Sequence, residues 1–212
     1  MEGTIDPYLQ AIIEAADCRD YTSRGENDPR FCKKRPTGSI ISLVLNMSSD
    51  TSSTFHIERA RAEHVPLILA FIRELAEYER LSHQVVATEA ALEQELFGSN
   101  PVAEVLIGFE ESHPVGFALY FHNFSTFLGQ RGIYLEDLFV RPAARGKGYG
   151  KALLCELARI AVERRAGRLE WAVLDWNAPS IAFYEGLGAH MMREWKLFRL
   201  TGDALHHLAE HS

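Results

Sequence analysis

The sequence predicts an α/β sandwich built on one mixed sheet rather than a doubly wound parallel sheet. The main observation is the order of its patterns: from residue 55 onward they are strand, helix, helix, three strands, helix, strand, helix and strand. A second observation is the turn around residues 112–114, which joins two strand patterns into an antiparallel hairpin. A third is the length of 212 residues, which suits one ordinary domain with some chain to spare.

The first half of this domain is expected to begin with a strand and two helices. FHIERA, residues 55–60, has the alternation of a short strand. Apolar residues then repeat at helical spacing, with Pro66 in the first turn, where its missing N–H is tolerated, and an expected end near Tyr78–Glu79. Thr88 is a candidate N-cap of the second helix, and Gly98 is its candidate stop.

Three strand patterns and a helix follow. AEVLIGFE (103–110) and PVGFALYFHNF (114–124) form the hairpin, and GIYLEDLFV (132–140) comes after a loop. Strict alternation divides the middle of this third strand between the two faces of the sheet. One face takes Glu136, Leu138 and Val140, and the other takes Leu135, Asp137 and Phe139. The next helix has an apolar stripe and is expected to close at Gly167, after two arginines.

The last part of the domain is expected to hold two strands and a short helix. LEWAVLDW (169–176) has the pattern of a fifth strand. Asn177 can cap a helix that begins at Ala178–Pro179 and carries Tyr184 on one side. WKLFRL (195–200) is the pattern of a last strand.

Residues 1–54 differ from the rest of the chain and hold no residues that suggest chemistry. They contain polar turn-forming stretches, one short apolar run and a Ser/Thr-rich linker at 48–54. Met47 stands just before this linker, so it is either the natural start of the protein or part of a loosely ordered extension. We therefore expect an N-terminal extension, 1–54, and one domain, 55–212.

Composition narrows the class of protein. With 47% hydrophobic and 24% charged residues and no apolar run of membrane-span length, the chain has the composition of a soluble globular protein. Early acidic residues do not fit a signal peptide, so a cytoplasmic protein with no membrane partner is expected. A net charge of -7 argues against a nucleic-acid partner. Three widely spaced cysteines, Cys18, Cys32 and Cys155, indicate free thiols and no metal site.

A glycine-rich turn, RGKGYG at 145–150, lies between a predicted strand and a predicted helix. Free backbone N–H groups and the helix dipole favour an anion there, while Arg145 and Lys147 add positive charge. The spacing fits neither a P-loop nor the dinucleotide-binding fingerprint. Taken alone, the turn allows two interpretations, a phosphate site and a plain flexible turn.

Neighbouring motifs support the phosphate site. LAEYERL, YLEDLFV, RGKGYG, DWNAPSIAFYEGLGA and a late WKLF occur in this order between Phe55 and Asp203. In this arrangement the chain resembles the GCN5-related N-acetyltransferases (GNAT), and among them the spermidine/spermine-type diamine acetyltransferases and their thialysine-acetylating branch. The resemblance implies a GNAT-like sandwich, whose mixed central sheet has two splayed parallel strands, here 137–141 and 170–175, flanked by helices.

The resemblance also implies a site for acetyl-CoA, with its pyrophosphate on the glycine turn and its pantetheine arm between the splayed strands. The implied coenzyme-binding residues are Leu138, Phe139, Val140, Arg145, Gly146, Lys147, Gly148, Tyr149, Gly150, Lys151, Asn177 and Ser180. Arg141 adds a further positive charge, and a backbone N–H of Leu138 or Phe139 could polarise the thioester carbonyl. Asn177 has a second interpretation, as a helix cap alone.

Two residues match the catalytic groups of the family. Tyr184 matches a tyrosine that protonates the coenzyme A thiolate, although a tyrosine on a short helix can also be a packed aromatic. Glu136 is the implied acceptor of the amine proton, and its apolar neighbours predict a mostly buried position. Asp137 faces the other way unless a bulge or the splay brings both acids to the site. Cys155, inside a helix, is a poor nucleophile.

The implied amine site consists of Tyr78, Glu79, Glu136, Asp137 and Trp195. Glu79 could hold a distal ammonium or be a solvated acid at a helix end. The position of Trp195 depends on residues 190–194, a region that is shorter here than in the family. Three C-terminal histidines are expected to lie in a solvated tail, with metal binding as the alternative: His206, His207 and His211.

These observations predict an acetyl-CoA-dependent N-acetyltransferase that works by direct attack in a ternary complex. The expected acceptor is a primary amine of a small cationic molecule, either a diamine or polyamine or a lysine-like amino acid. The alternatives are a coenzyme A-binding sensor or scaffold without turnover, and a protein lysine acetyltransferase. Relatives of this branch pair as two-fold dimers, so a homodimer is expected.

Overall fold

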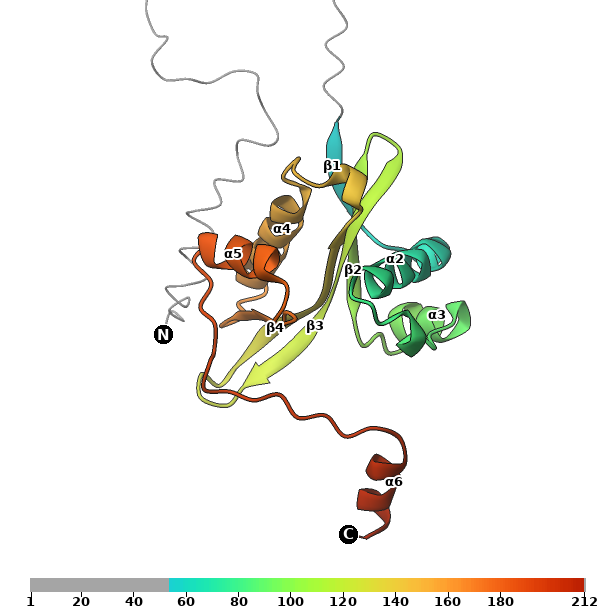
Figure 1. Cartoon of the computed structure of the whole chain (residues 1–212), viewed down its shortest axis with the longest axis vertical. Coiled ribbons are helices and arrows are strands. Elements are labelled where there is room, and N and C mark those ends of the chain that lie inside the picture. Colours follow the sequence, from blue (N-terminus) through green and yellow to red (C-terminus); the bar gives the residue numbers. More distant parts are fainter. Residues whose placement is uncertain (1–53, 212) are drawn as a thin grey trace, which may run out of the picture.

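A computed structural model of the chain describes residues 54–211. The expected N-terminal extension, apart from Thr54, therefore lies outside the described residues, as do Met47, Cys18 and Cys32. In the described part, one mixed sheet stands between two pairs of helices (Figure 1). This architecture confirms the fold class that the order of the sequence patterns predicts.

Five strands make up the sheet, and they lie side by side in chain order. They are β1 (Phe55–Arg59), β2 (Glu104–Glu110), β3 (His113–Ser125), β4 (Gln130–Val140) and β5 (Leu169–Trp171). The first four pair antiparallel, whereas β5 pairs parallel to β4. The hairpin expected around residues 112–114 is confirmed as β2 and β3.

Helices cover both faces of the sheet (Figure 1). One face carries α2 (Val65–Tyr78) and α3 (Glu89–Phe97), and the other carries α4 (Tyr149–Glu163) and α5 (Ala178–Gly186). A further helix, α6 (Gly202–Glu210), follows an extended segment that leaves the sheet. Single 3-10 turns occur at η2 (Ala62–His64), η3 (Ser82–Gln84) and η4 (Pro142–Ala144). Between residues 54 and 211, no helix combines the length and the apolar character needed to cross a bilayer.

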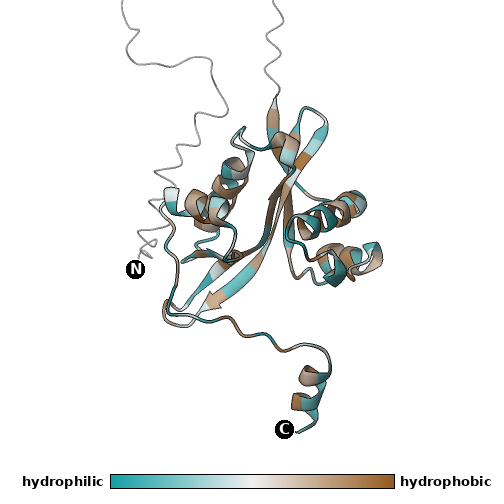
Figure 2. Ribbon diagram, viewed as in Figure 1, coloured by the Kyte–Doolittle hydropathy of each residue, from teal (hydrophilic) through white to brown (hydrophobic). Residues whose placement is uncertain are grey.

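Two apolar clusters hold these layers together. The cluster between the sheet and α4 includes Tyr120, Ile133, Leu135, Leu153, Leu157 and Ile160. The cluster between the sheet and α2 includes Ile68, Phe71, Ile107, Phe117 and Phe139. Figure 2 shows hydrophobic residues along the strands and on the helices beside them. Because burying one such side chain contributes about 1.5–3 kcal/mol, these clusters rather than helix propensity decide where the helices lie.

Local signals mark the helix ends at three expected positions. Pro66 occupies the first turn of α2, which ends at Tyr78 as predicted. Thr88 caps α3, because its Oγ1 accepts a hydrogen bond from the Ala91 N–H at 3.2 Å. Asn177 caps α5 in the same way, with its Oδ1 accepting from the N–H of residue 180 at 3.4 Å. These short-range bonds satisfy N–H groups that have no acceptor within the helix.

The expected end of α4 at Gly167 is wrong. The helix ends at Glu163, and Arg165 takes the left-handed conformation, with φ of 55°. Gly167 serves a different purpose, since its N–H donates to the Arg131 carbonyl at 2.8 Å and a Cβ there would lie 2.8 Å from the Gln130 side chain. The glycine therefore allows close approach of the chain to β4 rather than a helix stop.

A β-bulge interrupts β4 at Glu136. Leu119 of β3 faces Asp137, but the next residue, Tyr120, faces Leu135, so Glu136 has no partner across the ladder. The side chain of Glu136 is exposed, which contradicts the mostly buried position expected from its apolar neighbours. The physical reason is that the extra residue of a bulge leaves the regular pleat of the strand.

The bulge also changes which face one neighbour occupies. Strict alternation places Leu135 opposite Leu138 and Val140, whereas all three pack in the cluster on the α4 side. Phe139 lies in the α2-side cluster, so Asp137, two residues earlier, also faces α2. The bulge thus keeps the α4-side core continuous and turns Asp137 toward the end of α2.

The two C-terminal strand predictions are only partly correct. β5 ends at Trp171, although its pattern extends to residue 176. The segment 195–200 is not a strand, and its side chains are exposed, with Trp195 at 68% and Phe198 at 90%. A strand needs backbone partners for its N–H and C=O groups, and the sheet of the described chain offers none to this segment.

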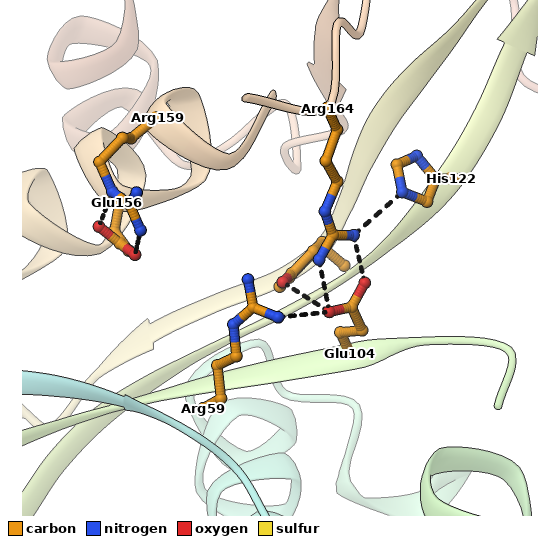
Figure 3. Close-up of polar contacts among 7 residues, drawn as sticks. Arg59, Glu104, His122, Glu156, Arg159 and Arg164 are labelled. Carbon is orange, nitrogen blue, oxygen red and sulfur yellow. Dashed lines mark hydrogen bonds and ion pairs between the residues drawn. The ribbon is translucent and has the colours of Figure 1, made fainter. Parts of the chain in front are cut away.

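Glu104 is the centre of an ion-pair cluster that joins three strands to the end of α4 (Figure 3). Arg164 donates to Glu104 Oε2 at 2.7 Å, the Tyr120 hydroxyl donates to the same oxygen at 3.2 Å, and Arg59 Nη1 lies 3.7 Å from it. Arg164 also contacts His122 Nε2 at 3.0 Å. The hydrogen bond from Arg164 lowers the pKa of Glu104, so the charged carboxylate stabilises the fold.

We expect Glu104→Gln to lower the free energy of unfolding at pH 7 by about 1–2 kcal/mol, a modest value because solvent screens this part-exposed carboxylate. The folded-state pKa of Glu104 lies below its ordinary 4.5, so the stabilisation is present above that pH and is lost as the pH falls through the lowered pKa. Urea unfolding at pH 7 and pH 3 measures both effects.

Glu156→Gln is the matched control, because it removes a carboxylate whose partner, Arg159, is exposed on α4 (Figure 3). Its effect should stay within about 0.5 kcal/mol. Equal losses in the two variants would contradict the role of Glu104, as would a loss in Glu104→Gln that persists undiminished at pH 3.

Candidate active site

The glycine-rich turn leads from β4, through η4, into the N-terminus of α4. Gly146 and Gly148 have φ of 78° and 86°, in the left-handed region that glycine adopts without strain. Gly148 is the N-cap of α4, and its position provides no side chain to cap the helix. The first N–H groups of α4, at residues 149–151, have no acceptor within the helix. The turn therefore presents open N–H groups and the positive end of a helix dipole, which together suit an anion.

Two basic side chains near the turn already have acidic partners. Lys147 Nζ lies 2.8 Å from Glu110 Oε1, and the buried Tyr149 donates its hydroxyl to the same oxygen at 2.7 Å. Arg141 donates to the Glu74 carboxylate at 2.9 and 2.7 Å. Arg141 thus fastens α2 to the end of β4 rather than adding its charge to the turn, and Tyr149 can offer a ligand only its backbone N–H.

Arg145 turns its side chain away from the turn and across the end of β4. Its Nε donates to the Val140 carbonyl at 2.9 Å. The guanidinium carbon lies 4.4 Å from the centre of the Tyr78 ring and 5.8 Å from that of Phe139. Both distances are within the range of a cation–π interaction. The arginine expected to bind phosphate therefore rests against the end of α2.

β4 loses one of its strand partners halfway along. Leu135 pairs with Trp171, the last residue of β5, and the described chain adds no further strand to this edge. Residues 138–140 keep their partners in β3 but have a free edge on the side of residues 172–176. Backbone groups on such an edge can pair with an extended ligand. This is the opening between parallel strands that the family resemblance implies.

Three carboxylates gather beside this opening. Burial, followed by the charges of Glu136 and Glu79, raises the pKa of Asp137 to about 7. Burial also raises the pKa of Glu79. Since the charges of both neighbours act on Asp137, each of them lies within electrostatic range of that carboxyl. Such a group attracts a cation, and it holds one carboxyl that can exchange a proton near neutral pH.

Tyr184 lies on α5, on the other side of the opening, against the last residue of β5. Its ring centre is 5.0 Å from that of Trp171 and 5.2 Å from that of Phe183. Burial raises the pKa of Tyr184 to about 12. The phenol is therefore protonated at neutral pH, and it can donate a proton but cannot act as a base.

The end of α2 meets the start of α5 across the opening. The Tyr78 hydroxyl donates to Asn177 Oδ1 at 3.4 Å, and the ring centre of Trp176 lies 6.0 Å from that of Tyr78. Asn177 is only 7% exposed, and the same Oδ1 caps α5 at Ser180. Asn177 therefore caps α5 as predicted, while its expected contact with the coenzyme stays a prediction, and its Oδ1 also links two helices on opposite faces of the sheet.

The structure brings together most of the predicted amine site but not Trp195. Glu79 and Glu136 both act on Asp137, whereas Trp195 is exposed in the segment that runs away from the sheet (Figure 1). The sequence analysis did not assign Trp176 to the site. Its position directly before the capping residue Asn177 was the signal that could have indicated it. Of the C-terminal histidines, His207 and His211 have ring centres 4.1 Å apart, with their planes tilted by 45°. Residues 54–211 contain no group of three or more His, Cys, Asp or Glu side chains that could hold a metal ion.

Comparisons with known proteins point to one family. Residues 69–189, more than half of the chain, match the Acetyltransferase (GNAT) family. An L-ornithine N5-acetyltransferase of Arabidopsis thaliana is 37% identical over 210 residues, which cover 76% of this chain and 92% of the relative. A thialysine N-epsilon-acetyltransferase of Bos taurus is 42% identical over 153 residues, covering 67% and 89%.

A solved structure gives the same result. An integron cassette protein from the mobile metagenome of V. cholerae superposes on this chain with a TM-score of 0.64 at 30% sequence identity. The superposition covers 74% of this chain and 98% of the cassette protein. The shared fold therefore extends over nearly the whole length of that neighbour.

Asp137→Asn is expected to stabilise the protein at pH 8. The folded-state pKa of about 7 lies above the ordinary 3.8, so folding becomes less favourable as the pH rises between these values and Asp137 loses its proton. Asparagine cannot ionise, and the free energy of unfolding should rise by about 1–3 kcal/mol at pH 8 and by clearly less at pH 5.

Urea unfolding at the two pH values measures this gain, with Glu136→Gln as the control at the neighbouring, exposed carboxylate. The control should give a smaller gain, because it only relieves repulsion of Asp137. A loss of stability in Asp137→Asn at pH 8, or the same gain at both pH values, would show that ionisation of Asp137 does not destabilise the folded protein.

Proposed function

Because the chain belongs to the GNAT family of acetyltransferases and is an N-acetyltransferase, we propose what its acceptor is. The proposed acceptor is a small molecule with a primary amine and a second positive charge. The observation that carries the proposal is the group of three carboxylates, Glu79, Glu136 and Asp137, beside the free edge of β4. Diamines, polyamines and lysine-like amino acids all have this pattern of charge. The named relatives act on ornithine and thialysine, which are amines of this kind.

Acetyl-CoA, the acetyl donor of GNAT enzymes, fits the features around β4. Its diphosphate suits the open N-terminus of α4, where Gly146 and Gly148 leave the backbone accessible. Its extended pantetheine arm suits the free backbone edge at 138–140. The groups proposed to hold it are the N–H groups of 146–151, the charges of Arg145 and Lys147, the β4 edge, and Asn177 and Ser180 at the start of α5.

The proton of the incoming amine is proposed to go to the neighbouring pair Glu136 and Asp137. Glu136 is reached by solvent, so it can take the proton through water. Burial, together with the charge of Glu136, raises the pKa of Asp137 to about 7. A base whose pKa lies near the working pH is the most effective. The distal ammonium of the acceptor is assigned to Glu79.

Tyr184 is proposed to return a proton on the other side of the reaction. Attack of the neutral amine on the thioester carbonyl forms the C–N bond and breaks the C–S bond. The nitrogen then loses its second proton to solvent as the amide forms, and the departing thiolate needs a proton. The buried phenol of Tyr184 is protonated at neutral pH and lies against Trp171, where the two strands part. Solvent then restores the phenol. No cysteine is required, and Cys155 is buried in α4.

We also propose that the protein is a cytoplasmic homodimer. The support for association is the extended segment 195–200, whose apolar side chains have no cover in the described chain, such as Leu197 at 78% exposed. Clustered apolar side chains of this kind mark contact surfaces. The cytoplasmic location is a prediction from composition.

Release of free thiol from acetyl-CoA, measured with a panel of amines, tests the proposed reaction. Ornithine, thialysine and spermidine should support turnover. Butylamine, which lacks a second charge, should give a kcat/KM at least about 10-fold lower, because it leaves a buried acid without its cation. Binding of coenzyme A without turnover of any amine would favour a sensor, and turnover of a lysine peptide alone would favour a protein acetyltransferase.

Tyr184→Phe should lower kcat by about 100-fold or more while leaving the affinity for coenzyme A unchanged, because only the proton donor is lost. Tyr120→Phe is the matched control, since Tyr120 is a buried tyrosine of the Glu104 cluster and its loss should change kcat by no more than about twofold. Full activity of Tyr184→Phe would remove this residue from the proposed role.

A further inference from the structure

The guanidinium of Arg145 lies between groups that belong to two different parts of the proposed site. Arg145 is the first residue of the diphosphate-binding turn, yet its cationic head contacts the ring of Tyr78 at 4.4 Å and that of Phe139 at 5.8 Å. Its Nε also donates a hydrogen bond to the carbonyl of Val140, at the end of β4. One side chain therefore bridges the donor side and the amine side of the opening.

The aromatic groups that hold this guanidinium are neighbours of the acids assigned to the amine. Tyr78 directly precedes Glu79, and Phe139 shares the α2 face of β4 with Asp137. A cation held at these rings thus lies on the α2 face of β4, the face that Asp137 shares, and beside the residue that precedes Glu79. The Tyr78 ring is fixed in place by its hydroxyl bond to Asn177 at 3.4 Å, so it forms a ready-made face for a cation.

On the basis of the proposed function, we infer that Arg145 occupies, in the donor-free protein, the place of the second positive charge of the acceptor, and that the diphosphate of the donor draws it out. Arg145 is exposed, and nothing lies within 4 Å of the Cβ position at Gly146, so the side chain has room to swing toward the turn. A charge-assisted pair of an arginine with phosphate is stronger than the cation–π contact of an exposed guanidinium. Donor binding therefore vacates the ring of Tyr78.

This exchange couples the two ligands. While Arg145 rests on Tyr78, a dicationic acceptor must displace it before binding, so acceptor affinity is low without donor. Once Arg145 moves to the diphosphate, that competition ends and its charge no longer repels the acceptor. Couplings of this kind amount to about 5- to 100-fold in affinity and act equally in both directions. The enzyme then binds donor before acceptor, and Tyr78 and Phe139 select acceptors with a second cation.

Calorimetry with free coenzyme A, which cannot react, tests the coupling. In the wild type, saturating coenzyme A should tighten the binding of spermidine or ornithine by about 5- to 100-fold. In Arg145→Gln, the same acceptors should bind without coenzyme as tightly as they bind the coenzyme-saturated wild type, and added coenzyme should have no further effect. Butylamine, with one charge, should show little coupling in either protein.

Lys147→Gln is the matched control, because it removes one positive charge from the same turn but none from the ring of Tyr78. This variant should bind coenzyme A more weakly than the wild type. Saturating coenzyme A should still increase its affinity for the acceptors, as in the wild type. Tyr78→Leu provides a second measurement, since it should weaken acceptor binding in the coenzyme-saturated protein.

Two results would overturn the inference. One is an unchanged coenzyme-free affinity for diamines in Arg145→Gln, and the other is an equal gain in Lys147→Gln, which would show a general charge effect. These outcomes differ from failure of the proposed function, in which spermidine and ornithine would bind neither the free nor the coenzyme-saturated protein, and no amine would release thiol from acetyl-CoA.

Discussion

The parting of β4 from β5 is the constraint on which the rest of the site depends. Pairing stops at Leu135 and Trp171, and residues 138–140 are left with backbone groups that no strand of the described chain satisfies on that side. Unsatisfied backbone is costly unless water or a ligand pairs with it. Each element that carries a functional group is attached to one side of this opening: α4 begins after β4, and α5 begins after the segment that follows β5.

The acids around the opening do not stabilise the fold. The bulge at Glu136 places an exposed acid next to Asp137, whose burial and acidic neighbours hold its pKa at about 7. Two strands away, on β2, Arg164 and Arg59 lower the pKa of Glu104, and this ion-pair cluster joins the layers. One carboxylate therefore stabilises the fold, and the other is maintained at a cost that the fold tolerates.

Sequence patterns predicted those features that depend on a few neighbouring residues. Thr88 and Asn177 cap their helices because a side chain reaches the N–H three residues ahead, a geometry that is local. The bulge at Glu136 was not predictable in the same way, because it depends on the register of β3 against β4. The segment 195–200 has a strand pattern but no strand partner, and the direction of Arg145 depends on a ring at residue 78. Each of these features depends on contacts between residues far apart in the sequence, which a local pattern does not contain.

Two of the tryptophans flank the opening from opposite sides. Trp176 is half-exposed, with its ring centre 6.0 Å from that of Tyr78, and Trp171 lies 5.0 Å from Tyr184. Indole emission responds to the polarity and charge of its surroundings, so the unlabelled chain contains its own optical reporters beside both the proposed amine site and the phenol. Occupancy of either half can thus be followed in real time by stopped-flow fluorescence, without attaching a dye.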